Sequence, residues 1–141
     1  RQARHNYFID ETYEAGLVLV GSEVKSLRDG KANLSDSYGQ VRNRDAILVN
    51  THISPYAGAN RFNHEPTRTR KLLLHSREIE RLTGKTKERG LTLIPLKLYF
   101  KGGRVKVELG LARGKKLYDK RETLKRKMAE REVERSIKGK H

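Results

Sequence analysis

The clearest pattern along the chain is an alternation of apolar and polar residues on both sides of Gly102-Gly103. Two adjacent glycines tolerate the positive φ angles of a two-residue hairpin turn, so Lys101 is expected to pair with Arg104. Pro95 then lies opposite Gly110 on the outer face, and because proline cannot donate to the ladder, a bulge or bend is expected there. One face of the antiparallel hairpin is wholly apolar, which predicts a sheet with one buried side. This face carries Phe100, Leu98, Leu96 and Ile94 on one arm and Val105, Val107, Leu109 and Leu111 on the other.

Shorter segments before the hairpin also have the pattern of strands. They are Tyr7 to Ile9 continuing through Tyr13, Leu17 to Val20, Tyr38 to Arg42 and Ala46 to Ile53 on either side of the turn residues Asn43-Arg44-Asp45, and Lys71 to Leu74.

Two short helices are expected between these strands. Ser22 is predicted to cap a helix that contains Val24 and Leu27 and ends at Gly30. Ser76 is predicted to cap a second helix, with Glu78 and Glu80 in its first turn and Ile79 and Leu82 facing inward. The segment from Tyr56 to Arg70 shows neither periodicity and is predicted to be a mobile loop.

The fold class that follows is mainly β, with about six to seven short antiparallel strands and inserted short helices. Such a set most economically forms a small closed or partly open barrel, and a β-sandwich is the alternative. Residues 1–112 carry nearly all of this pattern, and their length is enough for one domain with one core.

Residues 113–141 have a different composition and are interpreted as a basic C-terminal tail. From Asp119 onward the tail is rich in helix formers, but its apolar positions do not form one stripe. Leu117, Leu124 and Met128 fall on one side of a helix, and Val133 and Ile137 fall on the opposite side. A helix this polar is marginal alone, so the tail is expected to be disordered in the free protein or helical against a partner.

The charge balance narrows the choice of partner. The chain has 32 Lys and Arg against 17 Asp and Glu among 141 residues, a net charge of +15, and the tail alone holds 12 basic and five acidic residues. Such an excess indicates a polyanion, either nucleic acid or an anionic membrane. The longest uninterrupted apolar runs have four residues, too few to span a bilayer. The absence of cysteine excludes disulfides and thiolate metal sites and suits a reducing cytosol, so a cytoplasmic location is expected.

Signals for catalysis are weak. Gly84-Lys85-Thr86 resembles the end of a phosphate-binding loop but has Ile79 where the first glycine is required, and the run from Gly110 to Lys116 is one residue short. No two histidines stand at the spacing that presents a pair to one metal, and the carboxylates are scattered. We therefore expect a binding protein, not an enzyme, with no cofactor, no metal and no catalytic residues.

Several long runs of residues together resemble one family. They are Arg4-His5 with Tyr7-Phe8-Ile9, Tyr13 to Leu17, Gly21 to Arg28, Gly30 to Tyr38, Pro66 to Leu74, Gly114-Lys115-Lys116 and Asp119-Lys120-Arg121. In this order they resemble the small protein B (SmpB) family, the SsrA-binding proteins that are bacterial partners of transfer-messenger RNA. The resemblance covers the whole chain.

The resemblance implies an oligonucleotide-binding (OB)-like barrel and a role in ribosome rescue. Family members bind the tRNA-like domain of transfer-messenger RNA and accompany it, with elongation factor Tu and GTP, into stalled ribosomes. The C-terminal tail enters the decoding centre of the small subunit and the messenger channel, and translation resumes on the RNA's own reading frame. No membrane partner is implied, and the protein is expected to be a monomer.

The resemblance also implies RNA-binding residues on the barrel. Glu14 is the most informative, because a carboxylate repels phosphate but can accept hydrogen bonds from base N–H groups and so contribute selectivity. Leu73 is either a core residue or packs against unstacked bases. For Glu14 and the cations, the plain alternative is a solvent-exposed surface. The expected RNA-binding residues are Arg4, His5, Glu14, Lys25, Arg28, Lys31, Asn33, Arg68, Arg70, Lys71, Leu73 and His75.

In the tail, the resemblance implies ribosome contacts, with the ring of Tyr118 available to stack on a ribosomal base; family members often have His there. The expected tail residues are Gly114, Lys115, Lys116, Tyr118, Asp119, Lys120 and Arg121. Two alternatives come from other classes: a general RNA-binding protein of the ribosomal or initiation-factor type, and an RNA-processing enzyme.

Overall fold

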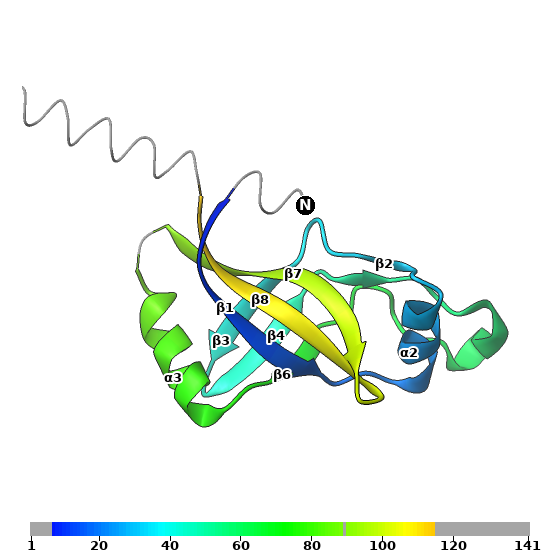
Figure 1. The fold of residues 1–141 in the computed structure, drawn as a ribbon. Coiled ribbons are helices and arrows are strands. Elements are labelled where there is room, and N and C mark those ends of the chain that lie inside the picture. The colour runs from blue at the N-terminus through cyan, green and yellow to red at the C-terminus, as the bar shows by residue number, and fades with distance from the viewer. Residues whose placement is uncertain (1–6, 89, 115–141) are drawn as a thin grey trace, which may run out of the picture.

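The computed structural model describes residues 7–88 and 90–114, in which six antiparallel strands close into a barrel. Every barrel strand has a partner on both sides, so the closed barrel is confirmed over the β-sandwich, and the predicted mainly β, OB-like class holds. Around the barrel lie β1 (Tyr7–Leu17), β6 (Arg70–Leu73), β4 (Asp45–Val49), β3 (Tyr38–Arg42), β7 (Leu91–Lys101) and β8 (Arg104–Gly114), which pairs again with β1 (Figure 1).

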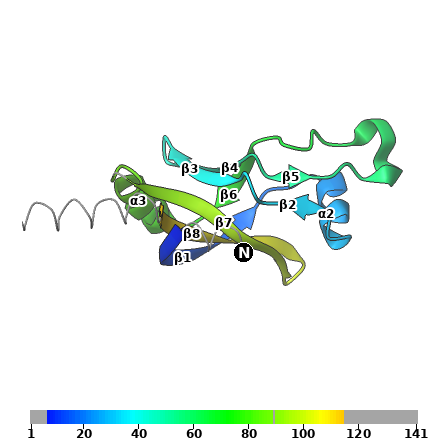
Figure 2. The same ribbon diagram turned by 90° about the horizontal axis from the view of Figure 1, so that it is seen from above.

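The remaining elements lie at the two ends of the barrel. At one end, β2 (Ala32–Asn33) and β5 (His52–Ile53) form a small separate sheet beside α2 (Gly21–Arg28) and the 3₁₀ helix η1 (Ala57–Phe62). At the other end lies α3 (Ser76–Lys85), as both views show (Figure 2).

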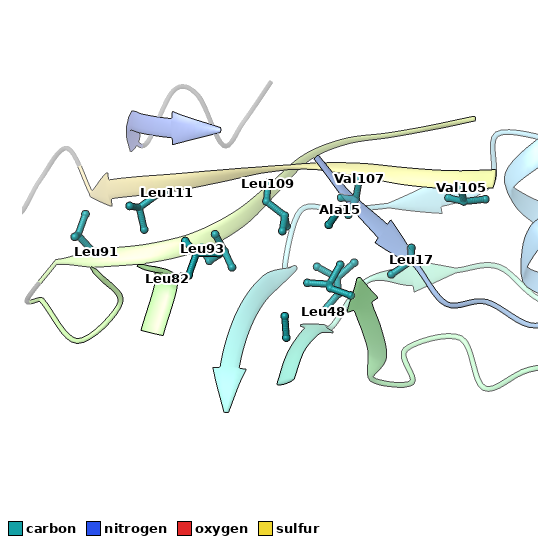
Figure 3. Packing of buried hydrophobic residues seen from close by; sticks show 12 residues of the cluster. Ala15, Leu17, Leu48, Leu82, Leu91, Leu93, Val105, Val107, Leu109 and Leu111 are labelled. Carbon is teal, nitrogen blue, oxygen red and sulfur yellow. The ribbon is translucent and has the colours of Figure 1, made fainter. Parts of the chain in front are cut away.

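The core is a cluster of aliphatic side chains inside the barrel (Figure 3). Leu48 of β4, Leu93 of β7 and Leu109 of β8 have no exposed surface, and Leu82 of α3 joins them from the end of the barrel. Full burial of each such side chain contributes about 1.5–3 kcal/mol. The barrel and α3 therefore share one core.

The predicted hairpin is confirmed near its turn and differs farther from it. Lys101 pairs with Arg104 and Phe100 with Val105, and both turn glycines have positive φ. The bulge expected at Pro95 lies between Pro95 and Lys97, and the extra residue shifts the register beyond it. Pro95 therefore lies opposite Leu109 instead of Gly110. Beyond the bulge, the predicted cross-strand pairing is wrong by one residue, so that Leu93 and not Ile94 faces the apolar side opposite Leu111.

The first strand continues without a break to Leu17, so the separate strand predicted from Leu17 to Val20 is wrong. Val18 still donates its N–H to the carbonyl of Lys71 at 3.0 Å, but residues 18–20 are not in a strand. The side chains of Val18 and Val20 are largely exposed. Because α2 begins at Gly21, the chain must leave the ladder at this point.

Both helices start close to the predicted residues, but neither predicted serine cap is correct. The N-cap of α2 is Val20, whose N–H donates to Glu23 Oε1 at 2.9 Å, and the N-cap of α3 is His75. Ser22 is buried, and its Oγ lies 2.8 Å from Nδ1 of His64. The Ser22 hydroxyl, which the sequence analysis assigned to the cap of α2, thus contacts a residue 42 positions later in the chain.

The second predicted hairpin is confirmed, with one arm shorter than expected. Asn43 and Arg44 have positive φ and form its turn, whereas Asp45, predicted in the turn, begins β4 opposite Arg42. The arm predicted from Ala46 to Ile53 is interrupted at Asn50, which also has positive φ, at 63°. The chain after this break leaves the barrel and forms β5 against β2.

The segment predicted as a loop from Tyr56 to Arg70 has a defined structure. It contains η1, and Asn63 Nδ2 donates to the carbonyl of Tyr56 at 2.7 Å. His64 is buried, with Nε2 lying 2.8 Å from the carbonyl oxygen of Ile53. These bonds connect residues without any periodic pattern, which is why periodicity did not reveal them.

At the C-terminal side, β8 continues to Gly114, two residues past the predicted domain boundary. The predicted tail from residue 115 onward lies outside the described residues, so its helical or disordered state stays a prediction.

Candidate nucleic-acid interface

The β7–β8 hairpin carries basic residues toward α2, at one end of the barrel (Figures 1 and 2). Its tip extends past the barrel wall, because β3 pairs with β7 only at Leu93. Cations from the hairpin and from α2 and its exit therefore occupy the same end of the molecule. They are Lys25, Arg28 and Lys31 from α2 and its exit, and Lys97, Lys101, Arg104 and Lys106 from the hairpin.

Glu14 lies on the outer surface of this sheet and is held by two residues of β7. The hydroxyl of Tyr99 donates to Glu14 Oε2 at 2.6 Å, and Lys101 Nζ lies 3.2 Å from both carboxylate oxygens. The bond from Tyr99, followed by that from Lys101, lowers the pKa of the Glu14 carboxyl. The same bond raises the pKa of Tyr99 to about 12. Glu14 is therefore an oriented, ionised acceptor, as hydrogen bonding to base N–H groups requires.

Leu73 lies at the end of β6 with 53% of its surface exposed. It borders a hollow of about 310 Å³ whose walls are mainly aliphatic and whose rim includes Arg104 and Lys106. A Cβ atom at position 16 would lie 3.2 Å from the Leu73 Cβ, so Gly16 allows the two strands to approach closely beside Leu73. The hollow has the apolar surface and cationic rim that an unstacked base needs.

Arg70 was expected to contact RNA, and its position contradicts this. Its side chain has no exposed surface, and Nε donates to Glu23 Oε2 at 2.5 Å, while Nη1 donates to the carbonyl of Thr51 at 2.6 Å. A guanidinium buried in this way cannot reach a phosphate. Arg70 instead attaches β6 to α2, because the buried carboxylate of Glu23 needs a cation.

Arg68 pairs with the same Glu23 carboxylate but remains partly exposed. Its Nη2 donates to Glu23 Oε1 at 2.6 Å and its Nε to Oε2 at 3.0 Å, and 32% of the side chain is exposed. Burial raises the pKa of Glu23, but the hydrogen bonds from Arg68, from the N–H of Val20 and from Arg70 outweigh it, so the pKa lies below its ordinary value. Arg68 remains a candidate RNA contact.

Two of the predicted cations lie over aromatic rings. Lys25 Nζ is 5.6 Å from the ring centroid of Tyr56, and the guanidinium of Arg28 is 5.9 Å from that of Phe100. Lys31 is exposed where the chain leaves α2. All three could contact phosphates from these positions.

Three other predicted residues are exposed on the described surface: Asn33, Lys71 and His75. Asn33 Oδ1 accepts hydrogen bonds from the N–H and hydroxyl of Ser35, so part of its hydrogen-bonding capacity holds a turn. Gly114 ends β8. The other predicted positions lie outside the described residues: Arg4, His5, Lys115, Lys116, Tyr118, Asp119, Lys120 and Arg121.

Tyr99 and Lys101 are functional candidates that the sequence analysis missed. The hairpin register placed both on its outer face, but nothing local indicated that β1 pairs with β8 and brings Glu14 to them. The contact spans 85 residues of chain between Glu14 and Tyr99.

In the described part of the chain, no group of three or more His, Asp or Glu side chains could hold a metal ion. Nor is any helix within residues 7–88 and 90–114 long and apolar enough to cross a membrane.

Comparison with known proteins connects this geometry to one family. Residues 1–139 match the family model described as "SmpB protein". An SsrA-binding protein of Desulforudis audaxviator is 64% identical over 140 residues, covering 99% of this chain and 92% of the relative. That of Geobacillus thermodenitrificans is 62% identical over 138 residues, covering 98% of this chain and 89% of the relative.

A solved structure is also similar. The chain from "tmRNA-SmpB: a journey to the center of the bacterial ribosome" matches with a TM-score of 0.70 and 52% sequence identity. The match covers 82% of this chain and 81% of that one.

Proposed function

The chain belongs to the SmpB family, and from this premise we propose that it is an SsrA-binding protein. It binds the tRNA-like domain of transfer-messenger RNA and delivers that RNA to stalled bacterial ribosomes for trans-translation. The observation that carries the proposal is the match over nearly the whole chain to SsrA-binding proteins at above 60% identity, together with the likeness to the tmRNA–SmpB structure.

The surface at the hairpin end carries two kinds of group with different roles in RNA binding. Exposed cations at α2 and on the hairpin attract phosphates without regard to sequence. Glu14, held by Tyr99 and Lys101, supplies an acceptor that favours particular base edges. The cations provide affinity, and the carboxylate provides selectivity.

The barrel, proposed as residues 1–112, captures the RNA, and the tail, proposed as residues 113–141, acts in the ribosome. The basic and helix-forming composition of the tail suits contact with ribosomal RNA in the decoding centre and the messenger channel. The candidate contacts are Gly114, Lys115, Lys116, Tyr118, Asp119, Lys120 and Arg121.

Five finer points follow from the same proposal. The protein works as a monomer in the cytoplasm, where bacterial translation takes place. Elongation factor Tu with GTP joins the complex through the RNA. The protein contributes binding and no catalysis of its own, and it needs no cofactor.

A titration with three labelled RNAs tests the proposal. The tRNA-like domain of transfer-messenger RNA should bind at least about tenfold more tightly than elongator tRNA or an unrelated duplex, a difference of about 1.4 kcal/mol. Equal affinity for all three RNAs would favour a general RNA-binding protein. Incubation with Mg²⁺ should leave the RNA intact, and a cleavage product would indicate a processing enzyme.

A further inference from the structure

The hairpin tip leaves an apolar hollow that neither the barrel core nor the predicted RNA contacts account for. Because β3 pairs with β7 only at Leu93, no strand within the described residues 7–88 and 90–114 covers the inner face of the tip on that side. α2 and the segment after it lie there instead, and they leave a hollow of about 280 Å³. Its lining residues are Leu27, Gly30, Ala32, Leu34, Leu98, Tyr99, Phe100 and Val105.

Phe100 is the unusual residue of this hollow. The alternation along β7 places it on the same face as the half-buried Leu98, and it pairs with the buried Val105. Even so, 42% of Phe100 is exposed, because the tip extends past the barrel. A large aromatic ring is thus presented at the surface with an apolar cavity beside it.

The charges around the hollow specify the kind of occupant. The guanidinium of Arg28 lies 5.9 Å from the Phe100 ring centroid, and a guanidinium can both stack on flat rings and pair with phosphate. Next to the lining positions of α2 and its exit stand two exposed cations, Arg28 and Lys31, and one acid, Asp29. On the hairpin, Lys97 and Lys101 flank the lining residues of β7 and pair with Glu108 and Glu14.

We propose that this hollow receives a single unstacked base of the bound RNA, which stacks on Phe100 with Arg28 beside it. The inference rests on the proposed function, since it takes RNA as the partner. The hollow, at about 280 Å³, is large enough for one base, because a cavity of about 150 Å³ can hold a benzene molecule. A flat, uncharged ring suits the aromatic and aliphatic walls, and the phosphates on either side of it suit the cations.

The proposed contact recognises an unpaired nucleotide and not a sequence. Every base has a π-face, so stacking tolerates all four, whereas a base inside a duplex cannot leave its stack without cost. The hollow therefore favours RNA with an exposed loop over a continuous duplex. Sequence selectivity comes separately from Glu14 on the outer face, which accepts hydrogen bonds from a base edge.

The absence of tryptophan from the chain allows a direct test. Phe100→Trp places one indole in the hollow, and stacking of a base on it quenches its fluorescence. Phe8→Trp is the matched control, because Phe8 has nearly the same exposure, 41%, and pairs with Arg113 at the far end of β8. The probe is the tRNA-like domain of transfer-messenger RNA, whose binding is followed separately by the anisotropy of a dye on the RNA.

The expected result is that the RNA quenches the indole of the Phe100→Trp variant and protects it from acrylamide, while the indole of the Phe8→Trp variant changes little. Phe100→Ala should weaken RNA binding roughly 5- to 150-fold, the range for loss of one base–aromatic stack, and Phe8→Ala should not.

Two outcomes separate this inference from the function on which it rests. RNA that binds the Phe100→Trp variant by anisotropy but leaves its fluorescence unchanged overturns the proposal and leaves the hollow open to a protein partner. Absence of an anisotropy change with the unmodified protein would instead refute the proposed function itself.

Discussion

Glu23 of α2 and Arg70 of β6 form an ion pair with a 2.5 Å contact and no exposed side-chain surface on either residue. The pair joins the end of the barrel that carries α2 to the strand that ends in Leu73. It thereby positions the exposed residues on both sides of the candidate RNA surface without contacting RNA itself.

Glu23→Ala should lower the free energy of unfolding by about 3–5 kcal/mol, because it leaves the charge of Arg70 buried without its counter-ion. Urea unfolding would measure the loss. Glu80→Ala is a suitable control, since Glu80 is an exposed glutamate on α3, and it should change stability by less than about 0.5 kcal/mol. A similar small effect for both variants would contradict the role assigned to the pair.

Stability should fall in acid. The folded-state pKa values of Glu11, Glu14 and Glu23 are lowered, so their stabilisation is present above the unfolded value of about 4.3 and is lost as the pH falls through the folded values. Chemical unfolding between pH 7 and pH 3 should show this decline. Glu11→Gln, which removes the ion pair with Arg81, should flatten the slope. An unchanged slope would show that Glu11 does not contribute.

Tyr99 should ionise near its pKa of about 12, because its hydroxyl donates to the Glu14 carboxylate. Ultraviolet absorbance during an alkaline titration measures this, and Tyr99→Phe identifies the signal. In Glu14→Gln the pKa of Tyr99 should move back toward the ordinary value of about 10, since the acceptor loses its charge. If the titration of Tyr99 does not move, the contact is absent in solution.

Glu14→Ala and Lys31→Ala should affect RNA binding in different ways. Removal of Glu14 frees Lys101 and reduces negative charge, so binding to unrelated RNA should be maintained while preference for the cognate RNA falls. Lys31→Ala should weaken binding to all RNAs and lower the salt slope by about one. Salt titrations with cognate and unrelated RNA measure both effects. Equal losses on the two RNAs for Glu14→Ala would contradict its role in selectivity.

Ending the chain after Gly114 should preserve RNA binding and abolish peptide tagging on stalled ribosomes. Gly114 is a better end than Ala112, because Arg113 pairs with Phe8 and Leu91 in the sheet and its Nε lies 2.9 Å from Asp10 Oδ2. Filter binding and a reconstituted translation assay measure the two activities. A second variant, in which Asp119-Lys120-Arg121 are replaced by alanines, should likewise bind the RNA and fail to tag peptides. Normal tagging by either variant would refute the role of the tail in the decoding centre.

Features that depend on neighbouring residues could be predicted from the amino-acid sequence. The turn at Gly102-Gly103 requires positive φ at two adjacent positions, and the alternation on either side of it follows from the pleat of a strand. The start of α3 within one residue of the predicted position and the bulge near Pro95 follow from similarly local properties, although the cap of α3 is His75 and not the predicted Ser76. Family membership could be recognised because several long runs of residues resemble SmpB motifs and occur in the same order as in that family.

The burial of individual polar and apolar side chains depends instead on tertiary contacts. Arg70 resembles its basic neighbours in sequence but is buried because Glu23 comes within hydrogen-bonding distance from another element. Phe100 follows the apolar alternation but stays exposed because the hairpin extends past the barrel, and Tyr99 reaches Glu14 because β8 pairs with both of their strands. These two contacts come from the packing of α2 on the barrel and from the closure of the barrel between β1 and β8. They bring together residues 47 and 85 positions apart, and a local sequence pattern contains no information about such pairs.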